Sequence, residues 1–402
     1  MIRKTLSVLL LFTTLLFAQQ QPYVLLVSFD AFRWDYLNRG ITPNLDTLIN
    51  KGVRAESFQP AFPSKTFPNH LSIITGMYPE NHGIIFNKFT NVNTREVYQL
   101  KDRAAVQNPK WYKGEAFWET AEKNGIITAS FFWPGSELDN ANRRPTYFKY
   151  YNQSVSYIAR IDTVINWLQL PSAKRPHFIT LYFHDTDFFG HKFGPNSPEI
   201  NQSIKRLDSL AGYINNGLIR IGMKDSVNII YLSDHGMTEI SPERIINIEK
   251  ILAGQKYKQG GAKTLAMITP REANKEIILS ILRKNQNHFK VYERKEMPEY
   301  FHFSKNKNIA PILLVADLGW SIVNNAQLKQ FINLGNKGNH GYDNFNIDMH
   351  GIFVASGPAF KKHYFTGTIR NIDVYPLLCK IFNIPPNPDI DGQLCKIEYI
   401  LK

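Results

Sequence analysis

Cysteine is scarce in this chain, and long apolar runs are almost absent beyond its first residues. Only Cys379 and Cys395 occur among 402 residues, so one disulfide at most is available, and the sequence leaves open whether it forms. No second long apolar run, no internal repeat, no low-complexity tract and no Pro/Ser-rich linker follows the N-terminal segment. We therefore expect no membrane span in the mature protein.

The N-terminal segment has the pattern of a secretory signal. Arg3 and Lys4 precede the mostly apolar stretch Leu6 to Phe17, and Ala18 is a small residue before a possible cleavage site at Gln19. The apolar stretch is shorter than the about 20 residues of a membrane-spanning helix, although an uncleaved anchor stays an alternative. We expect residues 1–18 to be a signal peptide and the protein to be exported, to a periplasm or outside the cell.

The positive charge of the chain is spread along its length. The formal net charge is +13, but Lys and Arg form only short clusters such as Lys305–Lys307 and Lys361–Lys362. We expect no stable nucleic-acid complex. A basic field can still raise the encounter rate with an anionic phosphate substrate.

Residues 19–402 are longer than a typical domain, which indicates one large domain with an insertion, or two domains. Expected strands alternate with helical stretches, as in α/β proteins. The expected strands are 23–29, 125–131, 178–183, 227–233 and 352–355, and a helix is expected from Thr42-Pro43 to Gly52. More than a hundred residues separate His235 from His350, so this stretch should carry structure of its own. Its expected elements are 262–268, 272–283, 290–292 and 312–316.

Six positions have the side chains of divalent-metal ligands. The three aspartates among them follow expected strands. In an open α/β sheet, ligand sites collect at the carboxyl ends of strands. Each residue alone has a structural explanation, such as a strand-end turn, but the whole set favours a two-metal hydrolase. Two of them are four residues apart and would share one face of a helix. The six are Asp30, Asp187, His191, Asp234, His235 and His350.

A hydroxyl nucleophile is available at Thr66. The segment 63–70 precedes the apolar run 71–74, so Thr66 is expected at or just before the N-terminus of a helix, where free N–H groups favour a phosphate anion. A hydroxyl needs a base or a metal ion to become a good nucleophile.

Seven stretches, in order along the chain, resemble motifs of the nucleotide pyrophosphatase/phosphodiesterase family in the alkaline phosphatase superfamily. They are Val27–Asp30, Phe62–His70, Thr75–Gly83, Trp133–Glu137, Asp187–Pro195, Ser233–Met237 and Asp348–Gly351. The segment Phe183–Asp187 departs from the Glu-Glu-Pro-Asp common in animal members and favours a bacterial-type member.

The resemblance implies a fold and a site. The fold is an alkaline-phosphatase-like, mostly parallel central sheet flanked by helices, with a small α/β capping subdomain at about 255–340. The implied cofactors are two Zn²⁺ ions per chain. One ion matches Asp30, Asp234, His235 and Thr66, and the other matches Asp187, His191 and His350. Thr66 would form a phosphothreonine intermediate. The remaining histidines of these regions, His70, His82, His184 and His340, are expected to be structural.

Three further residues concern the substrate. Asn87 lies twenty-one residues after Thr66, at the place of a family asparagine that contacts a non-bridging phosphate oxygen. Tyr151 matches a family tyrosine that stacks on a nucleobase, and Phe67, which follows the nucleophile, is expected to form a wall of the same pocket, although either could belong to the core. No arginine occurs in the matched catalytic stretches, which favours diesters over dianionic monoesters.

We therefore expect zinc-dependent hydrolysis of phosphodiester or pyrophosphate bonds, with nucleotide substrates and 5′-nucleoside monophosphates as products. Alternatives are a lipid or choline-headgroup phosphodiesterase, a phosphonate hydrolase and an inactive binding protein on the same fold. The last of these would need a broken site, and all seven metal-site positions are filled.

Overall fold

The computed structural model describes residues 21–271 and 273–402. The expected signal peptide at 1–18 lies outside these residues. Within them, no helix is both long enough and apolar enough to cross a membrane.

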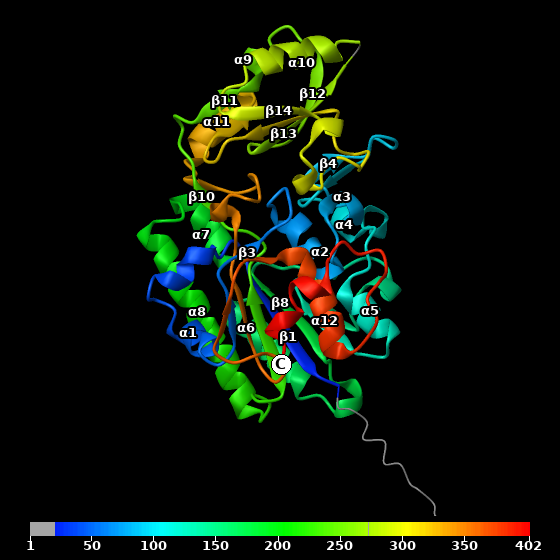
Figure 1. Cartoon of the computed structure of the whole chain (residues 1–402), viewed down its shortest axis with the longest axis vertical. Helices are drawn as coiled ribbons and strands as arrows, with labels where there is room; N and C mark the ends of the chain where they lie inside the picture. The colour runs from blue at the N-terminus through cyan, green and yellow to red at the C-terminus, as the bar shows by residue number, and fades with distance from the viewer. Residues whose placement is uncertain (1–20, 272) are drawn as a thin grey trace, which may run out of the picture.

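An eight-stranded sheet forms the centre of the molecule, as expected (Figure 1). The five consecutive strands from β9 to β7 in the order below are parallel to one another. The strand β18 is antiparallel to both of its neighbours, β2 and β9. The strand order is β19 (Tyr364–Thr366), β2 (Val53–Ala55), β18 (Phe353–Ser356), β9 (Val227–Leu232), β1 (Tyr23–Phe29), β8 (Phe178–Phe183), β6 (Thr128–Phe131) and β7 (Tyr147–Lys149).

Helices cover both faces of this sheet, and the central strands are accordingly apolar throughout. Val24 and Leu26 of β1 belong to one core, whereas Leu25, Val27 and Phe29 belong to the other. The first core includes residues of α2 (Thr66–Thr75), α5 (Phe117–Lys123) and α12 (Val374–Phe382). The second includes residues of α1 (Pro43–Ile49), α6 (Tyr157–Leu168) and α8 (Pro198–Arg220). Figure 1 shows these two helix groups on opposite sides of the sheet.

Shorter elements connect this framework. They are β3 (Phe58–Gln59) paired with β20 (Ile369–Arg370), β4 (Lys88–Thr90) paired with β5 (Val97–Gln99), and the helices α3 (Pro79–His82), α4 (Arg103–Gln107) and α7 (Asp185–Phe193). The expected helix that starts at Thr42-Pro43 is α1, which ends at Ile49. Gly52 follows it where the chain adjoins the backbone of Ala355 at the start of β2.

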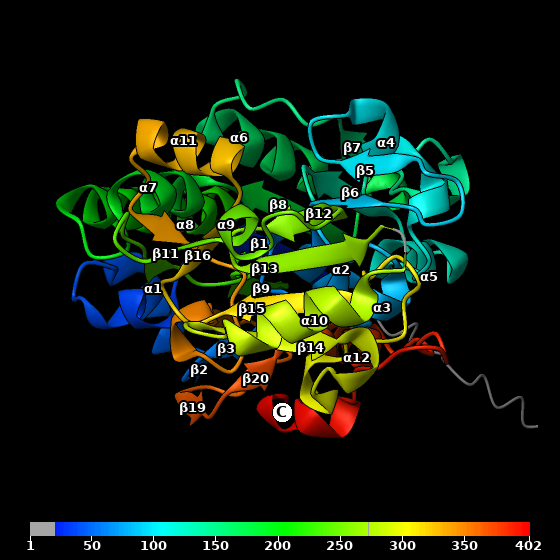
Figure 2. The same ribbon diagram turned by 90° about the horizontal axis from the view of Figure 1, so that it is seen from above.

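The insertion is a separate α/β unit that lies above the carboxyl edge of the sheet (Figures 1 and 2). Its four-stranded antiparallel sheet has the order β12 (Tyr257–Ala262), β13 (Leu265–Pro270), β15 (Ile312–Ala316) and β14 (Phe289–Glu293). The other elements are β11 (Ile245–Asn247), β16 (Ser321–Val323), α9 (Ile248–Ile251), α10 (Lys275–Lys284) and α11 (Asn325–Leu334). A third hydrophobic core fills this unit.

The observed insertion differs from the expected one at its edges. Its packed elements begin with β11, ahead of the expected start at 255, because residues from Ile240 onward already contribute to its core. The expected strand 262–268 spans a turn between β12 and β13. The strand 312–316 coincides with β15.

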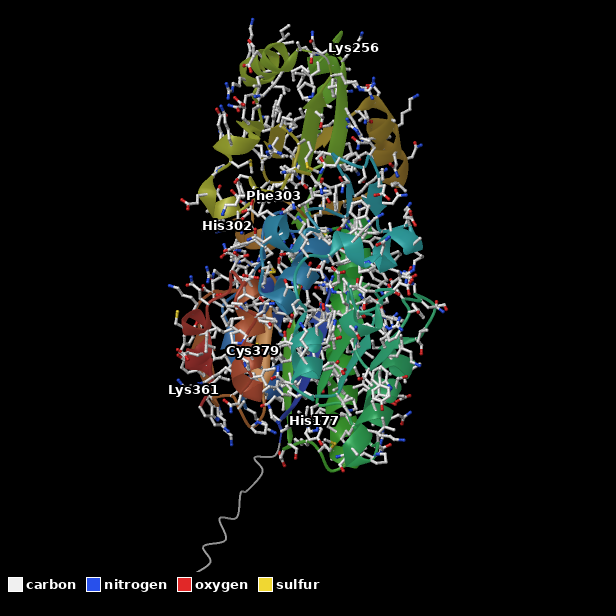
Figure 3. All side chains as sticks on the ribbon, turned by 90° about the vertical axis from the view of Figure 1, so that its right-hand side faces the viewer. His177, Lys256, His302, Phe303, Lys361 and Cys379 are labelled. Atoms are coloured by element: carbon white, nitrogen blue, oxygen red, sulfur yellow. The ribbon has the colours of Figure 1, made fainter. Side chains whose placement is uncertain are left out.

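Several contacts hold the insertion on the sheet domain, among them its neck, the segment around Ser304 and the hydrogen bond from Lys258 Nζ to Thr90 Oγ1 at 3.0 Å. At its neck, β10 (Thr238–Glu239) pairs with β17 (Gly338–Asn339). Away from the neck, the backbone N–H groups of Ser304 and Lys305 donate to Glu80 Oε2 of α3, at 2.6 and 2.7 Å. Beside this contact, Phe303 packs edge-on against Phe62, and Figure 3 shows Phe303 at the junction of the two units.

The two cysteines are not bonded to each other in this structure. Cys379 is buried in α12, whereas Cys395 is exposed near the C-terminus. Burial raises the pKa of the Cys379 thiol to about 12.

Candidate active site

The carboxyl ends of three adjacent strands bring the predicted carboxylates together. Asp30 follows β1, Asp234 follows β9, and Asp187 lies in the first turn of α7 directly after β8. Because β8, β1 and β9 are neighbouring parallel strands, the three residues converge at one edge, as the sequence predicts.

His235 Nε2 is the centre of the first group of residues. It lies 3.1 Å from Asp234 Oδ2, 3.5 Å from Asp30 Oδ1 and 3.3 Å from Thr66 Oγ1. The predicted first set of ligands is therefore assembled. Ligand atoms of Asp30, Asp187 and His235 all lie within 4.8 Å of one another, as a shared metal ion requires.

A second group consists of Asp187, His191 and His340. Their ligand atoms also lie within 4.8 Å of one another. Helix α7 places His191 Nε2 3.4 Å from Asp187 Oδ1, which confirms that these two residues share one helix face. His340 Nε2 approaches the same oxygen to 3.6 Å.

The imidazoles of these groups share one orientation. Nδ1–H donates to a backbone carbonyl in each ring: from His235 to Gly236 at 2.9 Å, from His191 to Gly338 at 2.9 Å, and from His340 to Ser64 at 2.8 Å. Each ring therefore directs Nε2 toward the carboxylates. Metal-binding histidines are held by the same kind of outer hydrogen bond.

The structure does not bring His350 to this cluster. Its Nδ1 accepts from the Ser57 hydroxyl at 2.8 Å, and its Nε2–H donates to the carbonyl of Asn344 at 3.0 Å. Both ring nitrogens are thus engaged with protein atoms. The segment has a different role, because the carbonyl of Met349 accepts from Gly236 N at 2.7 Å and braces the turn that carries His235. The expected ligand His350 is replaced in the cluster by His340, for which a structural role was expected.

In the described part of the chain, no lysine or arginine forms an ion pair with the carboxylates of the site, whose ion-pair partners are histidines only. Asp30 Oδ1, Asp187 Oδ1 and Asp234 Oδ2 are buried without a hydrogen bond. Burial, followed by the charge of Asp234, raises the pKa of Asp30 well above its usual range, and burial followed by the charge of Asp187 does the same to the pKa of Asp234. A divalent cation would offset both effects, so this donor set fits metal ions.

Thr66 is the first residue of α2, as predicted. His70 holds this turn, since its Nδ1–H donates to the Thr66 carbonyl at 2.9 Å and its Nε2 lies 2.8 Å from Ser28 Oγ. His82 has a similar part further along the helix, where its Nε2–H donates to Pro68 O at 3.1 Å. The expected structural role of His70 and His82 agrees with these contacts.

Two of the three expected substrate residues, Asn87 and Phe67, lie together at the start of α2. Asn87 Oδ1 accepts from Phe67 N at 3.3 Å, and no partner of the Asn87 amide N–H groups occurs among the described residues. Tyr151 is 37% exposed and packs edge-on against Phe132 at 5.2 Å. Phe67 is half-buried, and no ring contact joins it to Tyr151 in the described part of the chain.

Sequence reasoning missed two residues of the site besides His340. The hydroxyl of Tyr182 donates to Asp30 Oδ2 at 2.5 Å. The buried Lys65 donates from Nζ to the carbonyl of His340, and burial lowers the pKa of its ammonium to about 7. A signal existed for His340, because Asn339-His340-Gly341 repeats the pattern of Asp234-His235-Gly236.

The cluster does not coincide with a large cavity at the junction of the two units. That cavity, of about 720 Å³, lies between α3 and the loop 305–308 and is lined by Trp111 and several Lys and Asn side chains. None of the metal-binding candidates lines it. The arrangement of donor atoms, and not the cavity volume, identifies the site.

Comparison with known proteins gives one family over most of the chain. Residues 24–343 match the family model of type I phosphodiesterase / nucleotide pyrophosphatase. Bis(5′-adenosyl)-triphosphatase enpp4 of Xenopus laevis is 36% identical over 382 residues, which are 94% of this chain and 82% of that protein. Human ectonucleotide pyrophosphatase/phosphodiesterase family member 1 is 36% identical over 394 residues, or 95% of this chain. The match covers 42% of that human protein, so the chain spans less than half of its length.

A solved structure shares the fold. Murine ectonucleotide pyrophosphatase/phosphodiesterase 5, in an inactive form in complex with AMP, superimposes with a TM-score of 0.89 at 32% identity. The superposition covers 95% of this chain and all of that one. The chain therefore belongs to the type I phosphodiesterase / nucleotide pyrophosphatase family and is an enzyme of that family.

Proposed function

We propose that the chain hydrolyses phosphodiester or pyrophosphate bonds of nucleotides with two Zn²⁺ ions and releases 5′-nucleoside monophosphates. One observation carries the proposal: the Nε2 atoms of three imidazoles lie 3.1 to 3.6 Å from carboxylate oxygens that have no hydrogen-bond partner in the described part of the chain. Imidazole nitrogen and carboxylate oxygen are zinc ligands.

The ligands divide into two sets. Asp30, Asp234 and His235, with Thr66, would hold one ion, and Asp187, His191 and His340 the other. The second set keeps two of the residues expected from sequence and takes His340 in place of His350. This division follows from the distances to His235 Nε2 and to Asp187 Oδ1.

The chain's own residues account for the steps of the reaction. Two bound zinc ions would supply positive charge for the attacking and departing oxygens. Thr66 Oγ1 attacks phosphorus, so a bond from Oγ1 to phosphorus forms and the bond to the leaving oxygen breaks. Water then attacks the phosphothreonine, and Thr66 is regenerated. The free amide of Asn87 would donate to a non-bridging oxygen, and the N-terminus of α2 favours the phosphate anion.

The nucleotide preference rests on the aromatic side chains and on the relatives. Phe67 and Tyr151 are partly exposed, and we propose that they contact the base. The murine structure with AMP shows that the shared fold accommodates a nucleotide. No stable nucleic-acid complex is part of this proposal.

We further propose that residues 1–18 direct export, to a periplasm or outside the cell. Support comes from the Arg3-Lys4 and apolar pattern of this segment. The bacterial-type character rests on the Phe183–Asp187 segment alone, and the two relatives and the murine structure described above come from animals.

A substrate panel tests the function. Zinc-loaded enzyme would be assayed with an aryl diester of a nucleoside 5′-phosphate, with an aryl phosphocholine and with an aryl monoester. The proposal requires the highest kcat/KM for the nucleotide diester. Preference for the phosphocholine ester would identify a headgroup phosphodiesterase, and lack of turnover with every ester would favour a binding protein.

A further inference from the structure

Lys65, which immediately precedes Thr66, is a buried lysine, and Asp187 is the acidic residue whose charge acts on it. It is 6% exposed, and its backbone is extended (φ −123°, ψ 151°) at the N-cap of α2. Within the described part of the chain its ammonium makes no ion pair, and its hydrogen bond goes to the carbonyl of His340. A buried ammonium is costly without partners, so this contact requires an explanation.

The loop after His340 packs directly on the Lys65 side chain. A Cβ at Gly341 would lie 2.2 Å from Lys65 Cε and 2.7 Å from Thr264 Oγ1. Gly341 also has φ +103°, a conformation that favours glycine. The backbone can therefore approach the lysine stem this closely only because residue 341 lacks a side chain.

The residue before Lys65 reinforces the same contact. Ser64 accepts at its carbonyl from His340 Nδ1–H at 2.8 Å and donates from Oγ to the carbonyl of Tyr342 at 2.9 Å. Ser64 and Lys65 together fix the ring and the backbone of His340. They do so from the segment that carries the nucleophile.

We propose that Lys65 is a positioning residue that holds His340 toward Asp187 and thereby links the nucleophile loop to the second set of zinc ligands. This inference rests on the proposed function, since it takes His340 as a ligand. A lysine suits the task because its terminal nitrogen carries several N–H donors, and its long stem reaches from the helix start to the His340 carbonyl. Removal of the Lys65 amine should weaken the binding of one zinc ion and leave the binding of the other unchanged.

The test compares Lys65→Met with the unaltered enzyme. Methionine keeps most of the stem volume and removes every donor. Zinc affinity would be measured by chelator competition, and Co²⁺-substituted protein would report the ligand geometry by its visible absorption spectrum. We expect one ion to bind about 10–100-fold more weakly, which is typical when an outer hydrogen-bond partner is removed. The exposed Lys305→Met serves as the matched control and should retain both affinities.

A double-mutant cycle separates positioning from general stability. If Lys65 acts through His340, Lys65→Met should change zinc affinity in the native background and not in a His340→Ala background. Should Lys65→Met fail to fold, Lys65→Gln, which keeps one amide donor on a shorter stem, is used in the same cycle.

The outcomes distinguish this inference from the proposed function. If His340→Ala binds both ions normally, the second ligand set is incorrect and the inference fails with it. If His340→Ala loses one ion but neither Lys65 variant weakens it, only the role of Lys65 is refuted. Additive losses in the double variant would likewise overturn positioning through His340.

Discussion

The imidazole of His340 stacks on that of His235, with ring centroids 3.6 Å apart and an interplanar angle of 14°. His235 follows β9 of the sheet domain, whereas His340 follows the last strand of the insertion neck. The two ends of a long insertion thus meet in one site. This contact makes His340, and not His350, the residue on which the second ion should depend.

The two histidines therefore give a direct comparison. His340→Ala should remove about one zinc per chain and most of the activity, because a site with three protein ligands loses one. His350→Ala should keep both ions and lose stability instead, since its ring bonds Ser57 and Asn344. Metal analysis after dialysis, with thermal unfolding of the same samples, checks both. The reverse pattern would restore the set expected from sequence.

Thr66→Ala should lower turnover at least about a thousandfold, as removal of a catalytic nucleophile does. Zinc content should change little, since Thr66 contributes one of four candidate ligands to its set. Thr66→Ser retains a hydroxyl and should keep part of the activity. If the reaction of the unaltered enzyme is quenched during turnover, mass spectrometry should detect phosphate on Thr66. Substantial diesterase activity in Thr66→Ala would show that water attacks phosphorus directly.

Truncation of the two expected pocket aromatics tests whether they contact the nucleobase of the substrate. Phe67→Ala or Tyr151→Ala should weaken the binding of nucleotide diesters by roughly 1–3 kcal/mol for each stacking contact. The binding of small aryl diesters should weaken much less. The loss would appear in kcat/KM, and in KM alone if stacking is equal in ground and transition states. Phe365→Ala, at an exposed aromatic residue on β19, is the control. Equal losses for both substrate classes would mean that the rings only shape the site.

Acid should destabilise the protein through His82. Its Nδ1 accepts from Ile84 N at 3.3 Å while its Nε2–H donates to Pro68 O, so the folded protein requires the neutral ring. Burial lowers its pKa from 6.5 to about 3. The unfolded chain then binds the extra proton first, and stability falls as pH decreases from 6.5 toward 3, by at most about 1.4 kcal/mol per pH unit.

Denaturant titrations across this range measure the slope. His82→Gln should be less stable at pH 7 yet show a flatter pH dependence, whereas His363→Asn, at an exposed position, should leave the slope unchanged. An equally steep decline in His82→Gln would assign the acid sensitivity to other groups.

Much of the sheet could be predicted from sequence because its strands are strongly apolar and short. The expected strands 178–183 and 227–233 agree with β8 and β9 to within a residue. The position of the turn between β12 and β13 is harder to predict from the sequence. The expected strand 262–268 starts too early, because Lys263 and Thr264 form the turn before β13, and the preceding strand β12 is not among the expected elements.

Site residues at strand ends were predictable, and residues held by long-range contacts were not. Asp30, Asp187, Asp234 and His235 follow apolar strands, which gives each a local signal. The choice between His340 and His350 depends on which backbone carbonyl each ring meets, Ser64 for one and Asn344 for the other. No spacing rule encodes such partners, because they lie on segments brought together only by folding.

The contacts around the insertion decide how freely it can move. A neck formed by β10 and β17 alone would act as a hinge, and the unit above it could swing on a microsecond or slower timescale. The hydrogen bonds from Ser304 and Lys305 to Glu80 on α3, with those that join Asn308 to Val92 and Lys258 to Thr90, add fixed points away from the neck. A rocking motion of the insertion about its neck would have to break these bonds, so they restrain the hinge that the connectivity of the chain would otherwise allow.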